Sequence, residues 1–307
     1  MRRRDRGNDR SGGSSSRKKA KWFARAAGAR SGGIPRDARG VIVTCDGGKE
    51  RAAARDVARN LEDVARDMRR EGAGDGSCDV PARVGDDGDA RARAGDELER
   101  ELAELRERAP AFREVPLDLR ACTFVAASSE VTDAFDVADI VRRELERVKA
   151  SGTARSRHVL RVVPVDAVCF AGAEEIAEAA KPLIEKHFSG DKEQTFAISV
   201  ERRANSEVRR MDVIHGIASL IEQPRNKVNL SDPDLTIMVE IIKGIACLSV
   251  VRDYEKLCKY NVRLCAMTDE ERAHAKAERA ANVAAARVKD DAEKDAEDDG
   301  AAKEEDA

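Results

Sequence analysis

The stretch from Gln194 to Val251 constrains the fold of this chain more than any other part of the sequence. It opens with an alternating run, QTFAISV, which predicts a β-strand, and continues into the basic run ERRANSEVRR. The next run, MDVIHGIASLI, has helical spacing, and KVNLSDPDLTIMVEIIKGIACLSVV predicts an entry turn and two apolar strands. A tight hairpin turn is expected at Lys243-Gly244, where glycine would supply the positive φ.

The part of the chain before this stretch alternates strands and helices. GVIVTC, ACTFVAAS and HVLRVVPV have the apolar, β-branched composition of strands. Apolar residues at helical spacing predict helices from Lys49 to Arg70 and from Asp136 to Lys149, and Glu97–Glu107 also has helical spacing. This alternation predicts a small α/β (α+β) module over 40–165, with ferredoxin-like topology as the natural candidate and a Gly/Asp-rich insertion near 71–95.

The second module is expected to span residues 166–267. Its first helix is predicted over Ala173–Phe188, and Pro182 is expected to divide it into two short helices because proline removes a backbone hydrogen bond. Arg252–Cys265 is expected to pack back as a closing segment.

Most of the excess charge lies at the two ends. Residues 1–39 hold 13 Lys and Arg against 3 Asp and Glu, and we expect a disordered basic arm there. Residues 268–307 hold 7 basic and 14 acidic residues, which predicts a charged tail that is disordered or helical. The run RKKAKW within the arm is typical both of a nuclear-import signal and of a disordered nucleic-acid-binding arm. A nuclear protein is expected, with a cytoplasmic protein as the alternative.

Composition argues against several classes of protein. No apolar run approaches the roughly 20 residues that cross a membrane, so no membrane association is expected. The 7 cysteines are odd in number and several lie in apolar strands, which favours reduced thiols. The histidines and cysteines lack zinc-ligand spacing, and no glycine-rich fingerprint opens a strand–helix unit. The sequence therefore predicts no metal, no cofactor, no small-molecule substrate and no catalytic residue.

The basic run after the predicted strand is the leading candidate for a binding site. Arginine binds phosphate oxygens in bidentate fashion, and helix N-termini attract anions. The candidate RNA-binding residues are Arg202, Arg203, Asn205, Arg209 and Arg210. The alternative is a solvated strand end, in which Glu201, Glu207 and Asp212 pair with these arginines.

Two weaker candidate sites lie elsewhere. The run CDGGKER is a strand, a glycine-rich turn and a helix start, so its backbone could cradle a phosphate helped by Lys49 and Arg51. It lacks the spacing of a nucleotide-binding P-loop, and a plain strand–helix turn is the alternative. Lys227, before the first hairpin strand, is the other candidate.

The order of basic cluster, helix and V-N-L…P-D…V-E-I strand resembles the THUMP domain of tRNA-modifying proteins. Together with VIVTC near the start, RHVLRVVP in the middle and RDYEKLCKYN near the end, it resembles the eukaryotic THUMP-domain adaptor of tRNA cytidine acetylation. The resemblance implies a ferredoxin-like module before an RNA-binding THUMP domain. Only 40 residues follow Met267, which implies an adaptor that has no catalytic domain and is not an enzyme.

The resemblance also implies partners and a function. The adaptor would bind serine and leucine tRNAs and present them to a separate RNA cytidine acetyltransferase, which makes N4-acetylcytidine in the D-arm. The main alternative is a tRNA-binding subunit of another RNA-modifying enzyme, such as a methyltransferase. A self-sufficient RNA-modifying enzyme and a scaffold that binds only protein are further alternatives.

Overall fold

The computed structural model describes residues 33–72, 110–190, 192–222 and 225–278. Most of the basic arm, the Gly/Asp-rich insertion, the helix expected at Glu97–Glu107 and the tail beyond residue 278 lie outside the described residues. The described part forms two β-sheets, each with helices packed against it. This mixed α/β architecture confirms the expected fold class.

The first sheet has four antiparallel strands in the order β2-β3-β1-β4. The strands are β1 (Gly40–Cys45), β2 (Phe112–Val115), β3 (Cys122–Ala127) and β4 (Val159–Val165), and the helices are α2 (Glu50–Gly72), α4 (Ser129–Ala134) and α5 (Val137–Ser151). This strand order, with α2 and α5 as the two main helices, is ferredoxin-like. Strand β2 was not predicted, because the run FREV is too short to show an alternating pattern.

The helices of the first module follow directly from their sequence. Helix α2 buries Val57, Leu61 and Val64, which are three or four residues apart and therefore share one face. Helix α5 begins after Asp136, whose side chain accepts a hydrogen bond from the Ala138 N–H at 3.1 Å, the usual role of an N-cap carboxylate. These apolar faces pack on the sheet and leave the opposite faces to charged residues.

The second sheet has five strands in the order β5-β9-β8-β6-β7, and β6 runs parallel to both β7 and β8. The strands are β5 (Ala167–Phe170), β6 (Thr195–Arg203), β7 (Lys227–Val228), β8 (Leu235–Ile242) and β9 (Ile245–Arg252), and the helices are α6 (Ala173–Phe188) and α7 (Arg210–Ala218). The predicted hairpin of β8 and β9 is confirmed. Its positive φ lies at Lys243 (φ 52°) rather than at Gly244, which corrects the expected turn chemistry.

Helix α6 corrects a second expectation, because Pro182 lies inside one continuous helix. Pro182 is exposed, so the carbonyl that its missing N–H leaves free can be hydrated. Ile176 and Ile184, on either side of the proline, are buried against the second sheet and hold both halves of the helix on it.

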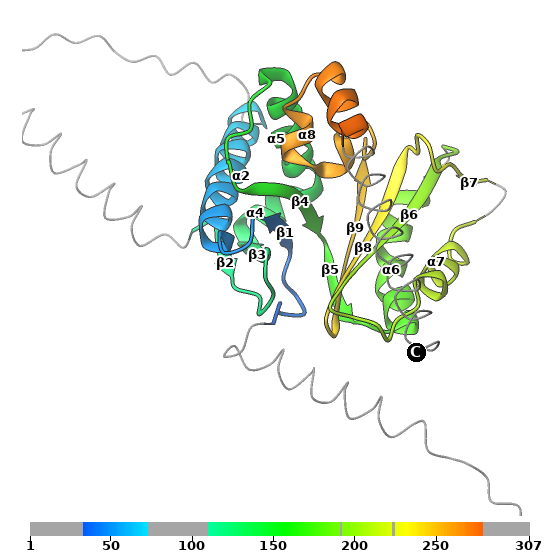
Figure 1. The fold of residues 1–307 in the computed structure, drawn as a ribbon. Coiled ribbons are helices and arrows are strands. Elements are labelled where there is room, and N and C mark those ends of the chain that lie inside the picture. The colour runs from blue at the N-terminus through cyan, green and yellow to red at the C-terminus, as the bar shows by residue number, and fades with distance from the viewer. Residues whose placement is uncertain (1–32, 73–109, 191, 223–224, 279–307) are drawn as a thin grey trace, which may run out of the picture.

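The two sheets share part of their core. Met238, Ile242 and Val251 of the second sheet pack in one apolar cluster with the strands and helices of the first. Helix α2 lies at one end of the molecule and α7 at the other, with both sheets between them (Figure 1). The folded part of the chain also begins earlier than expected. Ile34, which was assigned to the disordered arm, is buried in this core.

The closing segment after β9 packs on the core of the first module rather than on α6 and α7. It contains a 3-10 helix, η1 (Cys258–Tyr260), and α8 (Val262–Cys265), and it buries Tyr254 and Tyr260. Cys258, Lys259 and Tyr260 have φ of 52°, 56° and 61°, a left-handed turn. Such a conformation costs about 1–2 kcal/mol per residue, so tertiary contacts must hold it.

The chain continues as a helix over residues 269–278. Thr268 and Glu271 form a reciprocal capping box, in which the Thr268 N–H donates to Glu271 at 2.8 Å and the Glu271 N–H donates to Thr268 Oγ1 at 3.2 Å. In the part of the chain that the structure describes, six cysteines carry free thiols and no helix is long and apolar enough to span a membrane.

Candidate nucleic-acid interface

Arg202 and Arg203 occupy the last two positions of β6. This corrects the prediction from the sequence, which placed them in the loop after a shorter strand. Successive side chains of a strand point to opposite faces of the sheet. Arg202 lies on the face covered by α6 and α7, where its Nη1 donates to the Val208 carbonyl at 2.9 Å. Arg203 lies on the face toward the first module, so the two arginines do not form one cluster.

Arg203 contacts a buried carboxylate on the neighbouring strand. Its Nε lies 3.5 Å from Oε2 of Glu240, a residue of β8 whose side chain is 1% exposed. Arg161 of β4 approaches Oε1 of the same carboxylate at 3.9 Å. Burial raises the pKa of Glu240, and the positive charges of Arg203 and Arg161 oppose this rise. We call Arg161, Arg203 and Glu240 the interior ion cluster.

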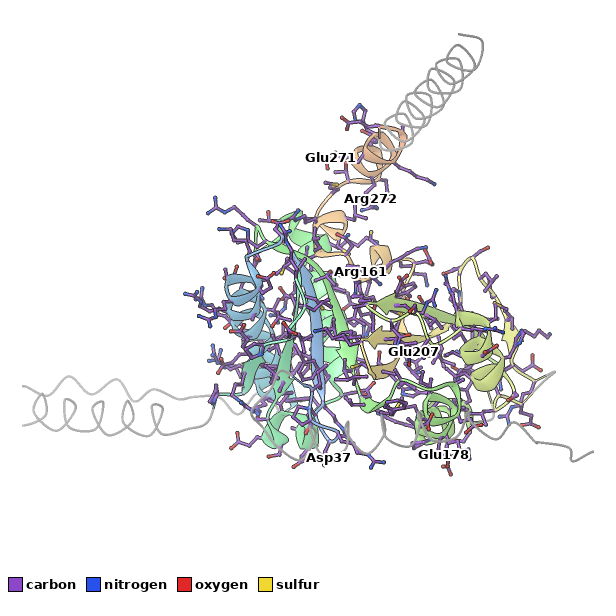
Figure 2. All side chains as sticks on the ribbon, turned by 60° about the horizontal axis from the view of Figure 1, so that its bottom comes forward. Asp37, Arg161, Glu178, Glu207, Glu271 and Arg272 are labelled. Atoms are coloured by element: carbon purple, nitrogen blue, oxygen red, sulfur yellow. The ribbon has the colours of Figure 1, made fainter. Side chains whose placement is uncertain are left out.

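Arg161 joins three parts of the molecule and was not singled out from the sequence. Beyond Glu240, its Nε donates to the Lys259 carbonyl at 3.0 Å and its Nη2 donates to the Tyr254 hydroxyl at 3.0 Å. It therefore links β4 of the first module to the second sheet and to the left-handed turn of the closing segment. Figure 2 shows Arg161 near the middle of the molecule, between the two sheets.

Asn205 holds a turn in place. Its Oδ1 accepts from the backbone N–H groups of Glu207 and Val208 at 3.1 and 3.0 Å, and its Nδ2 donates to the Lys243 carbonyl at 2.6 Å. The Lys243 ammonium lies 2.8 Å from a carboxylate oxygen of Asp118 in the first module. The amide of Asn205 thus fixes the loop between β6 and α7 against the tip of the β8–β9 hairpin.

Arg209 and Arg210 are the members of the predicted set best placed to contact RNA. Both are exposed, and among the described residues neither forms an ion pair. They open α7, and Arg209 occupies the N-cap position without a side-chain hydrogen bond to the helix. The first N–H groups of α7 therefore lack a side-chain cap beside two exposed guanidinium groups, an arrangement that favours an anion.

Lys227 lies apart from these arginines. It pairs with Thr195 at the start of β6, whereas Arg209 follows the end of that nine-residue strand. Lys227 is exposed on the short edge strand β7. The structure therefore does not bring Lys227 together with the arginine pair.

The glycine-rich turn before α2 already holds an anion of the protein itself. The Glu50 carboxylate accepts the N–H of Gly48 at 3.0 Å and that of Ala121 at 2.7 Å. These hydrogen bonds, the one from Ala121 first, lower the pKa of Glu50. Lys49 and Arg51 are exposed beside this turn, so their RNA contact, which stays a prediction, would involve side chains rather than this backbone cradle.

No group of three or more potential metal ligands is present among the described residues. The exposed cations described above lie at the start of α7 and at the turn before α2. Such surfaces contact phosphate groups, which fix the position of a folded nucleic acid.

Comparison with known proteins gives these features a context. The THUMP domain family matches residues 170–251. THUMP domain-containing protein 1 of Bos taurus is 29% identical over 260 residues, which cover 82% of this chain and 71% of that protein. The Homo sapiens protein is 29% identical over 73% of this chain, and the match covers 63% of its length, less than two thirds.

Two further comparisons concern shorter parts of the chain. The Saccharomyces cerevisiae protein named tRNA acetyltransferase TAN1 is 32% identical over 119 residues, 36% of this chain and 41% of that protein. The solution structure of the THUMP domain of THUMP domain-containing protein 1 is 38% identical and covers 25% of this chain and 81% of that domain, with a TM-score of 0.24.

Proposed function

We propose that this chain, which contains a THUMP domain and is homologous to THUMP domain-containing protein 1 and to the yeast protein, binds tRNA for a modifying enzyme. The observation that carries the proposal is the match to a yeast protein whose name states tRNA acetylation. The matched THUMP region, residues 170–251, includes the exposed, uncapped start of α7.

The finer proposal is a non-catalytic adaptor. It binds serine and leucine tRNAs and presents the D-arm to a separate RNA cytidine acetyltransferase, which forms N4-acetylcytidine, and it acts in the nucleus. Arg209 and Arg210 contact phosphates of the tRNA, because guanidinium groups suit phosphate oxygens and the start of α7 favours negative charge. Folded RNA is recognised mainly through such backbone contacts and through shape.

The decisive experiment measures N4-acetylcytidine in purified serine and leucine tRNAs by nucleoside mass spectrometry, in cells with and without this protein. Loss of the modified nucleoside while the acetyltransferase remains present supports the adaptor. Unchanged levels contradict it. Copurification then separates the alternative, because a methyltransferase bound to this chain would replace the acetyltransferase as its partner.

Variants of the start of α7, expressed in cells that lack the wild-type chain, test whether this surface is needed for N4-acetylcytidine formation. Arg209→Gln with Arg210→Gln should restore less N4-acetylcytidine than the wild-type chain, and should weaken tRNA binding about ten-fold at low salt with a smaller salt dependence. The charge-matched control is Arg143→Gln with Lys256→Gln, two cations that lie against Glu71 and Asp253. Equal tRNA affinity of the two double variants would show that Arg209 and Arg210 do not contact the tRNA.

A further inference from the structure

Three arginines on α2 form a line that the sequence analysis did not recognise. Arg51, Arg55 and Arg59 are four residues apart, so they lie on one face of the helix over about 12 Å. All three are exposed, and among the described residues none forms an ion pair. Like charges at this spacing repel one another and destabilise a helix, so the pattern is unfavourable for folding alone.

The arginines of the neighbouring helix α5 are paired. Arg147 of α5 contacts Asp67 of α2 at 2.8 Å, and Arg142 contacts Glu146 at 2.6 Å. The line on α2 therefore differs from the arginines of α5, each of which contacts a carboxylate.

The line borders a hollow of about 400 Å³ between α2 and the segment before β4. Its lining residues are Ala52, Arg55, Asp56, Arg59, Ala154, Arg155, Ser156, Arg157 and His158. A second hollow, of about 480 Å³, adjoins it, shares Ala52 and Arg55, and is also lined by Lys49 and Arg51. Cations thus line both hollows along the first half of α2.

Most of the acidic side chains that line the two hollows already accept hydrogen bonds from groups of the protein. Asp56 accepts a hydrogen bond from the Ser156 hydroxyl at 2.7 Å. Arg155 is also engaged, with Glu144 at 2.6 Å and Asp63 at 3.2 Å. Glu50, beside the larger hollow, accepts backbone N–H groups, and Glu114 is the other carboxylate there. Arg55, Arg59 and Arg157 remain as exposed cations whose guanidinium groups have no carboxylate partner among the described residues.

We propose that the three arginines of α2 and the adjacent Arg157, which precedes β4, form a second phosphate-binding surface for the backbone of a folded RNA. From here on, the α2 arginine line means Arg51, Arg55, Arg59 and Arg157. The inference rests on the proposed function, since the RNA is the tRNA that the THUMP domain binds. The smaller hollow has no Phe, Tyr or Trp and no apolar side chain larger than alanine. Its one aromatic ring is the His158 imidazole, and it offers no large apolar anchor for a protein partner. The larger hollow also has Leu117 and Leu119 in its lining, so the choice of RNA rests on the arginines around the smaller one that lack a carboxylate partner among the described residues.

The α2 arginine line and the start of α7 lie at opposite ends of the molecule (Figure 1). One RNA that contacts both must extend across the two modules. The contacts that hold the modules together then fix the distance between the two surfaces, which lets a rigid frame select RNA by shape.

The test compares two triple variants of the full chain that change net charge equally. Arg55→Gln, Arg59→Gln and Arg157→Gln remove three of the four cations of the line. The control variant, Arg143→Gln, Lys149→Gln and Lys256→Gln, removes three cations of α5 and the closing segment. Unmodified tRNA binding is measured at several salt concentrations. The line variant should lose about ten-fold or more in affinity at low salt, and its slope of log K against log salt should fall by roughly two to three relative to the control.

Lysine replacements at the same three positions should recover most of the salt slope, since lysine keeps the charge, and thermal unfolding checks that every variant folds. Equal affinity and slope in the two triple variants would overturn the α2 surface while leaving the tRNA function intact. Absence of tRNA binding by the wild-type chain would instead overturn the proposed function. Tighter binding of polyglutamate than of tRNA to the wild-type chain, lost in the line variant, would overturn RNA in favour of an acidic protein partner.

Discussion

The interior ion cluster and the α2 arginine line use the same side chain for opposite purposes. In the interior, Arg161 and Arg203 flank a carboxylate that is 1% exposed, and Arg161 also hydrogen-bonds two groups of the closing segment. Along α2, Arg55 and Arg59 face solvent without a carboxylate partner among the described residues. The difference shows that burial and partners, and not the local density of arginine in the sequence, decide which positive charges are available to RNA.

Arginines close together in the sequence also differ in burial. Arg203 belongs to the interior, whereas Arg209 and Arg210, a few positions later, are exposed at the start of α7. A substitution in the interior should therefore change the free energy of unfolding, and one on the surface should change RNA affinity.

The largest effect is expected for Arg161→Ala. The substitution leaves Glu240 buried with a single cation at 3.5 Å and removes the donor to the Lys259 carbonyl in the left-handed turn. Breaking a buried ion pair by removing one partner costs about 3–5 kcal/mol. Urea unfolding at neutral pH should show a loss of that size.

Lys256→Ala serves as the control for this prediction, since its side chain is 62% exposed and pairs with Asp253 at the surface. Its effect on the free energy of unfolding should be close to the error of the measurement. If Arg161→Ala is no more destabilising than this control, the interior ion cluster does not hold the two modules together.

A smaller effect should separate the two adjacent arginines of β6. Arg203→Gln should destabilise the protein by about 1–3 kcal/mol, because Glu240 stays buried and loses a positive neighbour. Arg202→Gln should cost about 0.5–1.5 kcal/mol, the usual contribution of a single hydrogen bond such as that to the Val208 carbonyl. Urea unfolding of both single variants, with tRNA affinity measured below the unfolding transition, tests the assignment.

The reverse order would contradict the assignment of faces. If Arg203→Gln leaves stability unchanged and weakens tRNA binding, then Arg203 belongs to the RNA surface after all. A double variant of Arg202 and Arg203 cannot separate these outcomes, because it changes both faces of the sheet at once.

Local sequence patterns predicted much of the fold. Helix α5 and the hairpin of β8 and β9 follow from the spacing of apolar residues within each segment. Local sequence patterns do not show which face of a strand packs against another module. Glu240 reads as one polar residue in an apolar strand, and only the packing of β4 on the second sheet supplies Arg161 as its neighbour.

Local sequence patterns were likewise insufficient to define the candidate binding surface. The basic run at Arg202–Arg210 was found as a cluster, yet β6 extends further than expected and its alternation separates the first two arginines. In contrast, the spacing of Arg51, Arg55 and Arg59 was present in the sequence as a helical period of charge. That signal could have been used, although the absence of partners becomes visible only when α5 and the segment before β4 are in place.

The smallest expected effect concerns Asp166, which joins β4 of the first sheet to β5 of the second. Burial, followed by the nearby Asp136 carboxylate, raises the pKa of Asp166 to about 7, although Lys186 and Arg39 oppose the rise. Because the pKa is higher in the folded state than the ordinary 3.8, the folded state binds this proton more tightly. The resulting stability is complete below pH 3.8 and is lost as the pH rises through about 7.

The free energy of unfolding, measured in urea at pH 5 and pH 8, should therefore fall less between these values in Asp166→Asn than in the wild-type chain. The difference should be on the order of 1 kcal/mol, because Asp166 is partly exposed to solvent. Glu240 has a raised pKa and contributes with the same sign, whereas His187 has a pKa lowered by burial and contributes with the opposite sign. Both are common to the two proteins, so the comparison isolates Asp166. Parallel pH dependence in the two proteins would show that Asp166 is already ionised in the folded state at pH 5, and that the junction between the sheets does not bury its carboxylate.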